Sequence, residues 1–171
     1  TFRLGKPWPE KISVAGIAVD ESADRLFAVT RENNSLYSFR LSDKKIISRI
    51  DLGGEAYTCL LSSDKKKLYV SCWGCDQILT IDLNSLTIID RVKVGDNPND
   101  MALSSNGDRM FVANANDNSV SCIDLKTKQV TEVLNAALFP NSPSGSTTNS
   151  VTLSSDNRTL FIANADNNCV A

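Results

Sequence analysis

Short apolar strands and polar turns follow one another along almost the whole chain. Four segments can be aligned on this pattern: RLFAVTRENNSLYSF, KLYVSCWGCDQILTI, RMFVANANDNSVSCI and TLFIANADNNCVA. Alternating or β-branched residues fill each strand, and Asp, Asn, Ser and Gly residues fill the turns. No segment has the 3.6-residue period of an amphipathic helix. The pattern therefore predicts an all-β protein.

The second residues of these segments are Leu26, Leu68, Met110 and Leu160, so the steps along the chain are 42, 42 and 50 residues. Flanking apolar runs bring each unit to four strands. A period near 42 residues with four strands per unit is typical of a β-propeller. We predict one partial propeller domain over residues 1–171. Its blade-like repeats lie at about 16–54, 57–96, 97–137 and 149–171, with an inserted loop at 138–148.

The motifs LYVSC, MFVAN and LFIAN, with LSSD or LSSNGD before them and IDL after them, resemble the YVTN-type repeat of bacterial YncE-like and surface-layer propellers. The resemblance runs from Gly16 onward and implies a seven-bladed ring, of which about four blades are present. It also implies a periplasmic, cell-surface or secreted bacterial protein. We expect missing blades or a second copy to cover the exposed strand edges.

The segment from Leu138 to Asn168 further resembles a blade of YncE-like propellers that are fused to a C-terminal phosphoesterase of the alkaline phosphatase superfamily. This resemblance implies a catalytic domain elsewhere in the polypeptide, which would supply the metal ions and the nucleophile.

Composition and charge remove several classes of function. The chain has no histidine, so catalytic triads with a His base and imidazole-rich metal sites cannot form within it. Its 18 basic and 20 acidic residues form no basic stripe, so we expect no nucleic-acid partner. No apolar run approaches the roughly 18 residues of a membrane span, and the first ten residues lack a signal-peptide core. We expect no cofactor.

The Cys-Trp-Gly-Cys stretch, Cys72 to Cys75, replaces the hairpin between the second and third strands of the second repeat. No helix follows to activate a thiolate, and the other cysteines are too isolated to complete a zinc site. Two reduced thiols filling a turn are the favoured interpretation. A local disulfide and metal or redox chemistry are the alternatives. Cys59 aligns with apolar positions and is predicted to lie in the core.

Asparagine and aspartate residues recur in the other hairpins, at Asn114–Asn118 and Asn164–Asn168. Their oxygens could bind calcium, but recurrence in successive repeats favours a role in the turns, because Asn and Asp tolerate left-handed φ. Asp82 and Asp124 are likewise expected to form turns.

Two further features occur once. The insertion Ala137–Thr147 is either a surface insertion or a binding loop, and in an antiparallel blade it shares a face with the hairpin at Cys72–Cys75 and with the connections between blades. The segment Lys6–Glu10 places Trp8 between two prolines, where packing of the N-terminus is favoured over recognition.

These features predict a non-catalytic binding or scaffold module that contacts a protein, glycan or small ligand through the hairpin face. The alternative is the propeller portion of a larger exported hydrolase, either a phosphoesterase fusion or a lactonase-like enzyme. We expect this chain not to be an enzyme, because the residues that occur once supply no converging acid, base or metal ligands. The predicted binding residues are Cys72, Trp73, Gly74, Cys75, Asn97, Asn114, Asn116, Pro140, Asn141, Ser142 and Ser144.

Overall fold

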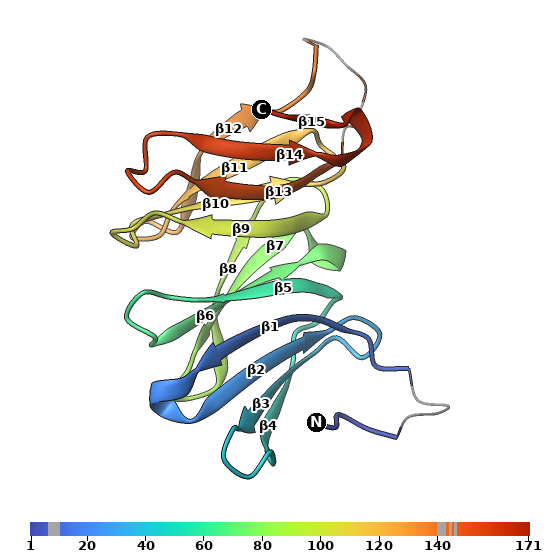
Figure 1. The fold of residues 1–171 in the computed structure, drawn as a ribbon, viewed down its shortest axis with the longest axis vertical. Coiled ribbons are helices and arrows are strands. Elements are labelled where there is room, and N and C mark those ends of the chain that lie inside the picture. The colour runs from blue at the N-terminus through green and yellow to red at the C-terminus, as the bar shows by residue number, and fades with distance from the viewer. Residues whose placement is uncertain (7–10, 140–142, 144, 146) are drawn as a thin grey trace. The chain divides into compact units, whose positions relative to one another are not determined.

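The computed structural model describes residues 1–6, 11–139, 143, 145 and 147–171, and over these residues it is nearly all β (Figure 1). Four antiparallel sheets follow one another in chain order. This confirms the predicted fold class, and the sheets are consistent with a partial β-propeller. Among the described residues, no helix has the length and apolar character needed to cross a membrane.

Each sheet consists of strands that are consecutive in the chain. The first contains β1 (Val14–Asp20), β2 (Arg25–Thr30), β3 (Ser35–Arg40) and β4 (Ile46–Asp51), and the second contains β5 (Ala56–Leu61), β6 (Lys67–Cys72), β7 (Gln77–Asp82) and β8 (Thr87–Lys93). The third contains β9 (Pro98–Leu103), β10 (Arg109–Asn114), β11 (Ser119–Asp124) and β12 (Gln129–Asn135), and the fourth contains β13 (Thr148–Leu153), β14 (Leu160–Asn164) and β15 (Cys169–Val170). Short 3-10 turns occur at η1 (Glu21–Ala23), η2 (Trp73–Cys75) and η3 (Ala165–Asn167).

The chain divides into two compact units. Unit 1 comprises Thr1–Cys75 and Leu79–Asp90, and unit 2 comprises Asp76–Ile78 and Arg91–Ala171. Unit 1 therefore holds the first sheet and most of the second, whereas unit 2 holds the third and fourth.

The hairpin between the second and third strands ends in the same backbone conformation in every sheet. Its last residue adopts left-handed φ at Asn34, Asp76, Asn118 and Asn168, with values of 49°, 55°, 49° and 49°. Asn and Asp are the residues that adopt this conformation most readily besides glycine. The Asn or Asp at the last position of each hairpin is thus explained by turn geometry, whereas Asn114 and Asn164 are buried residues at the ends of β10 and β14.

The turn after the third strand also repeats. Asp82 Oδ1 accepts hydrogen bonds from the backbone N–H groups of Asn84 and Ser85 at 3.0 and 2.8 Å. Asp124 Oδ1 accepts the equivalent pair from Lys126 and Thr127 at 2.9 and 2.7 Å. These backbone bonds and those from the Ser85 and Thr127 hydroxyls lower the pKa of both carboxyl groups, so each Asp remains an ionised turn former.

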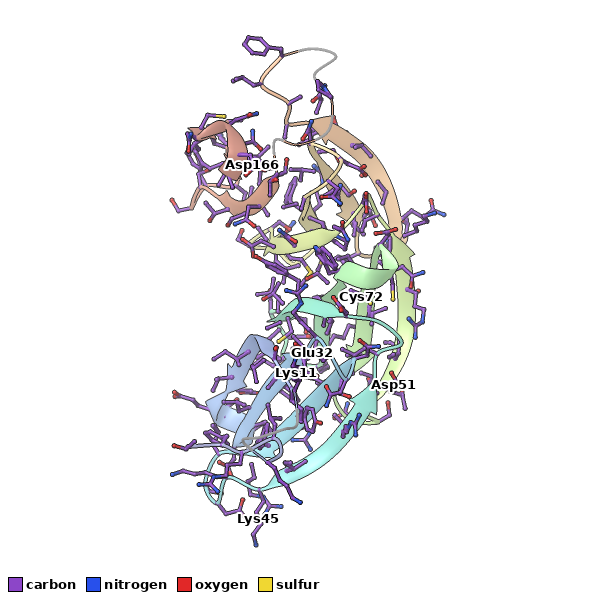
Figure 2. All side chains as sticks on the ribbon, turned by 90° about the vertical axis from the view of Figure 1, so that its right-hand side faces the viewer. Lys11, Glu32, Lys45, Asp51, Cys72 and Asp166 are labelled. Atoms are coloured by element: carbon purple, nitrogen blue, oxygen red, sulfur yellow. The ribbon has the colours of Figure 1, made fainter. Side chains whose placement is uncertain are left out.

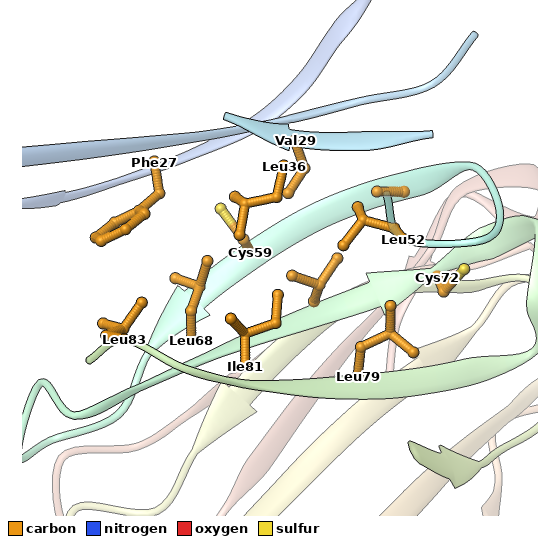
Figure 3. Close-up of a cluster of buried hydrophobic side chains, with 12 residues drawn as sticks. Phe27, Val29, Leu36, Leu52, Cys59, Leu68, Cys72, Leu79, Ile81 and Leu83 are labelled. Carbon is orange, nitrogen blue, oxygen red and sulfur yellow. The ribbon is translucent and has the colours of Figure 1, made fainter. Parts of the chain in front are cut away.

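The core of unit 1 lies between its two sheets (Figure 3). Fully buried side chains from both sheets meet there, including Phe27, Leu36, Leu68 and Ile81. Cys59 belongs to this cluster as predicted, and burial raises the pKa of its thiol to about 12. The cluster consists of Phe27, Val29, Leu36, Leu52, Ala56, Cys59, Leu68, Val70, Cys72, Leu79, Ile81 and Leu83.

The first sheet has a second, smaller apolar cluster formed with the N-terminal segment. Phe2 packs edge-on against Phe39 with ring centroids 5.4 Å apart, and Leu4 joins the same cluster. Offset or edge-to-face aromatic contacts of this kind are worth about 0.5–1.5 kcal/mol beyond burial alone. The segment therefore covers a sheet surface. Trp8 lies outside the described residues.

In unit 2, the third and fourth sheets are joined by apolar and polar contacts. Ala113, Val120 and Ala136 of the third sheet pack against Val151 and Ile162 of the fourth. Close to this cluster, the first strands exchange polar contacts: Asn99 Nδ2 donates to Asn149 Oδ1 at 2.9 Å, and Ser150 Oγ donates to Asp100 Oδ2 at 2.5 Å.

A buried carboxylate ties the sheets of unit 1 together on the side of the turns between first and second strands. Asp20, 5% exposed, ends β1 and accepts a hydrogen bond from Lys65 Nζ at 2.8 Å. Ser22 adds bonds from its hydroxyl and backbone N–H. The hydrogen bond from Lys65 is the main cause that lowers the Asp20 pKa from 3.8 to about 2.

We predict that this carboxylate makes the protein acid-sensitive. Because the folded-state pKa lies below the ordinary value, its stabilisation is complete above about pH 4 and is lost as the pH falls toward 2. Asp20→Asn should lower the midpoint of thermal unfolding at pH 7 and flatten its dependence on pH between about 4 and 2. Circular dichroism melts across this range would measure both effects.

The control is Asp51→Asn, which removes an exposed carboxylate at the end of β4. It should leave more of the wild-type acid dependence in place. Equal slopes for wild type and Asp20→Asn would contradict the assignment.

Candidate ligand-binding face

The hairpin between β6 and β7 contains the predicted Cys-Trp-Gly-Cys stretch as the turn η2. Cys72 is the last residue of β6 and is fully buried, at the end of the unit 1 core next to Leu52 and Leu79 (Figure 3). Trp73 and Cys75 are half-buried, and Gly74 is exposed. One cysteine therefore belongs to the core, whereas the other three residues reach the surface.

Cys72 and Cys75 occupy positions whose side chains contact each other in the preceding repeat. Subtracting 42 residues gives Thr30 and Asn33, where the Thr30 hydroxyl hydrogen bonds to Asn33 Oδ1. The first position is fully buried in both hairpins. These two positions of the repeat thus hold a hydrogen-bonded Thr and Asn in the first sheet and two cysteines in the second.

In the third sheet, the corresponding residues are Asn114 and Asp117, which lie beside the connection between β8 and β9. Asp117 Oδ2 accepts a hydrogen bond from the Asp96 backbone N–H at 2.6 Å. A Cβ on Gly95 would lie 2.6 Å from Asn114 Nδ2 and would overlap Asp117. Asn114 also donates to the Ser119 and Ser121 hydroxyls, each at 2.9 Å. This pair therefore secures its turn through polar contacts.

In the second sheet, the two thiols converge on the connection at Gly54. A Cβ on Gly54 would overlap Cys75 Sγ and lie 3.1 Å from Cys72 Sγ. Cys75 Sγ also lies 3.6 Å from the Gly53 carbonyl oxygen, at the distance of a weak S–H···O hydrogen bond. Both sulfurs therefore lie close to the space that a side chain at position 54 would occupy, and glycine leaves this space empty.

Beside these thiols, Arg31, Glu55 and Trp73 form a half-exposed cluster. The Arg31 guanidinium lies over the Trp73 ring, with Cζ 5.3 Å from the centroid, and its Nη2 is 3.4 Å from Glu55 Oε2. The Gly74 backbone N–H donates to the Glu55 carbonyl oxygen at 3.1 Å, which joins the hairpin to the connection. The Arg31 and Glu55 side chains are 43% and 42% exposed. A cation, a carboxylate and an aromatic face are thus presented together.

A second carboxylate nearby is already used by the protein. Glu32 accepts hydrogen bonds at 2.6 Å from the Ser13 hydroxyl and backbone N–H, and these bonds lower the Glu32 pKa. Figure 2 labels Glu32 and Cys72, which both lie at hairpin ends of unit 1. Glu32 orders the start of β1 and is not positioned as a proton acceptor for a ligand.

The remaining predicted residues lie in unit 2. Asn97 has left-handed φ of 54°, its N–H donates to Asp76 Oδ1 at 3.1 Å, and its side-chain oxygen accepts from Asn116 Nδ2. Asn97, Asn114 and Asn116 therefore gather around one hairpin. Pro140, Asn141, Ser142 and Ser144 lie outside the described residues. Of the inserted loop, Pro143 O accepts from Asn118 Nδ2 at 2.8 Å.

Arg31 and Glu55 were not predicted from the sequence. Arg31 occupies the hairpin position of Trp73 one repeat earlier, and Glu55 occupies the connection position of Asn97. Their departure from the repeat is the signal that could have identified them. Within the described part of the chain, no group of three or more His, Cys, Asp or Glu residues could hold a metal ion.

The family comparison agrees with the arrangement of sheets. A family model described as "Lactonase, 7-bladed beta-propeller" matches residues 55–145, more than half of the chain. The chain belongs to this lactonase family of seven-bladed β-propellers. The match supports a propeller family in general and does not extend to the YVTN-type or YncE-like subgroup or to a phosphoesterase fusion.

This lactonase-family chain is also similar in fold to a solved structure titled "Kuenenia stuttgartiensis Hydrazine Synthase". The TM-score is 0.77 at 18% identity, over 95% of this chain and 45% of that one. The chain therefore spans less than half the length of that structure, and the similarity concerns the fold alone. No curated protein matches the sequence.

The expectation that this chain is not an enzyme is wrong, because the family that it matches is one of lactonases. That expectation depended on the absence of histidine and on residues that occur once. It did not consider Arg31 and Glu55, whose Nη2 and Oε2 atoms lie 3.4 Å apart.

The burial of the thiols predicts which ones react in the folded protein. Burial raises the pKa of Cys59 to about 12 and that of Cys122 to about 11, so neither supplies thiolate near neutral pH. Native alkylation at pH 8 should label the half-buried Cys75 before Cys59 and Cys122. Peptide mapping of a time course would give the order, and early labelling of Cys59 would contradict this burial.

Proposed function

We propose that the protein containing this chain is a lactone hydrolase and that the cluster of Arg31, Glu55 and Trp73 binds its substrate. The family match supports the class of reaction. The observation that carries the assignment of the site is the convergence of a cation, a carboxylate and an aromatic ring in half-exposed positions. They come from the hairpin between β2 and β3, the connection between β4 and β5, and the hairpin between β6 and β7.

Hydrolysis of a lactone requires stabilisation of negative charge on the carbonyl oxygen and removal of a proton from the attacking water. Water adds to the ester carbonyl carbon, which places negative charge on the carbonyl oxygen, and the attacking water loses a proton. The C–O bond of the ring then breaks, and the ring oxygen takes up a proton to give a hydroxy acid. A hydrogen-bond donor at the carbonyl oxygen and an acceptor for the water proton are therefore needed.

Arg31 and Glu55 have the matching chemistry. The Arg31 guanidinium donates hydrogen bonds and remains charged, so it stabilises the developing oxyanion and afterwards binds the product carboxylate. Glu55 accepts a proton from water. Their separation of 3.4 Å is longer than the roughly 2.7–2.9 Å of a tight charge-assisted bond, so both groups retain hydrogen-bonding capacity for a ligand.

Trp73 positions the Arg31 cation and adds apolar surface beside it. Its indole face already lies beneath the Arg31 guanidinium, which fixes the orientation of that cation. Small-ligand sites combine an aromatic wall with a few polar groups in this way. The predicted ligand-binding role of Trp73 thus becomes part of a site that includes two residues from the first sheet and the following connection.

The proposal is tested with glucono-1,5-lactone, by measuring acid release in a pH-stat and subtracting the spontaneous rate. The protein should accelerate hydrolysis, and Arg31→Gln, Glu55→Gln or Trp73→Ala should each lower the enzymatic rate roughly 10- to 100-fold. An enzymatic rate that is zero, or that survives all three substitutions, would refute the proposal.

Arg49→Gln is the matched control. Arg49 also lies over an aromatic ring, with Cζ 5.7 Å from the Tyr37 centroid, and its Nε donates to Ser35 Oγ at 2.9 Å. It belongs to β4, and its described contacts are with Ser35 and Tyr37 rather than with Arg31, Glu55 or Trp73, so its loss removes the same kind of contact and leaves those three side chains in place. Its rate should equal that of the wild type.

A further inference from the structure

We propose that Cys72 and Cys75 are a redox modification site, at which thiol–disulfide exchange with a small disulfide forms a disulfide within the hairpin turn. The inference rests on the geometry of the turn and does not require lactone hydrolysis. It also distinguishes these residues from the other three cysteines of the chain.

The first observation is the convergence of both sulfurs on Gly54. The site of the missing Gly54 Cβ is overlapped by Cys75 Sγ and is 3.1 Å from Cys72 Sγ. Both sulfurs consequently border one small space. A disulfide needs room for two sulfur atoms between neighbouring Cβ atoms, and a side chain at position 54 would fill this room.

The backbone brings the two residues to a suitable separation. Cys72 immediately precedes η2 and Cys75 ends it, so they are three residues apart across one 3-10 turn. Such a turn rises about 2.0 Å per residue and repeats after three residues, which places the two Cα atoms about 6 Å apart. Disulfides span Cα distances of about 4.4–6.8 Å. The bond can therefore form without unfolding the hairpin.

The neighbouring repeat shows that side chains at these two positions meet. Thr30 and Asn33 take the same places in the first sheet and are hydrogen bonded to each other. A disulfide between Cys72 and Cys75 is the covalent counterpart of that contact. It would replace the weak contact of Cys75 Sγ with the Gly53 carbonyl oxygen, 3.6 Å away.

Differences in burial set the order of the chemical steps. Cys75 is half-buried and attacks the small disulfide first, as a thiolate, which gives a mixed disulfide and releases one small thiol. Cys72, fully buried beside it, then attacks Cys75 Sγ and releases the second small thiol. Two protein thiols become one disulfide, and the two electrons and two protons pass to the two small thiols.

The other cysteines lack this arrangement. Cys59 lies in the core, and burial raises its pKa to about 12. Cys122 is buried on β11, and its pKa is raised to about 11 by burial and by Glu132. Cys169 belongs to β15, where Asn164 Nδ2 approaches its sulfur at 3.8 Å. Among the described residues, the pair at η2 is the one in which two thiols share a single turn.

The test treats the folded protein with glutathione disulfide, alkylates it without reductant, and measures intact mass and peptide maps. A Cys72–Cys75 disulfide is expected: the peptide that holds both cysteines should carry no alkyl group and no glutathione, and it should weigh about 2 Da less than its reduced, unalkylated form. Alkylation of Cys75 after this treatment, or a stable glutathione adduct on Cys75 of the wild type, would overturn the proposal.

Cys72→Ser should retain one glutathione on Cys75, because the resolving thiol is missing. Cys169→Ser is the matched control and should oxidise as the wild type does. Since Cys72 is buried, circular dichroism must show that its variant is folded.

Gly54→Ala tests the geometry with both thiols present. The added Cβ occupies the shared space, so disulfide formation should slow at least about tenfold. Formation at the wild-type rate would contradict the role assigned to Gly54.

Discussion

Burial of apolar side chains between successive antiparallel sheets is the constraint on which the rest of the structure depends. A sheet of this kind has two faces, and in unit 1 one of them is covered by the next sheet through the cluster around Phe27, Leu68 and Ile81. The N-terminal segment covers part of the other through Phe2. Because apolar burial is the main favourable term in folding, the strands must keep their pattern in every repeat.

Because apolar burial fixes the strands, the sequence at the hairpin ends can differ from one repeat to the next. Once the strands are fixed by packing, the turn needs only a residue that tolerates left-handed φ, as at Asn34 and Asp76. The positions just before it can hold Thr and Asn, two cysteines, or Asn and Asp without disturbing the sheet. Differences between blades therefore accumulate on this edge, where the proposed ligand-binding cluster and the thiol pair both lie.

Much of the fold could be predicted from the sequence because it depends on local and periodic signals. The alternation within strands, the 42-residue step and the Asn and Asp turns are each visible in short windows, and the burial of Cys59 followed from its alignment with apolar positions. The candidate site was harder to predict from the sequence. Arg31 and Glu55 are ordinary surface residues in the sequence, and only their contact across a hairpin and a connection gives them a shared role.

The sequence by itself determined the class of fold and the order of its strands, since hydrophobic periodicity and turn residues act over a few positions. It also marked Cys72–Cys75 as a departure from the repeat. The tertiary structure decided what that departure means. It placed both sulfurs around Gly54 and brought Arg31 over Trp73, because contacts between residues distant in the chain depend on how sheets pack and not on local pattern.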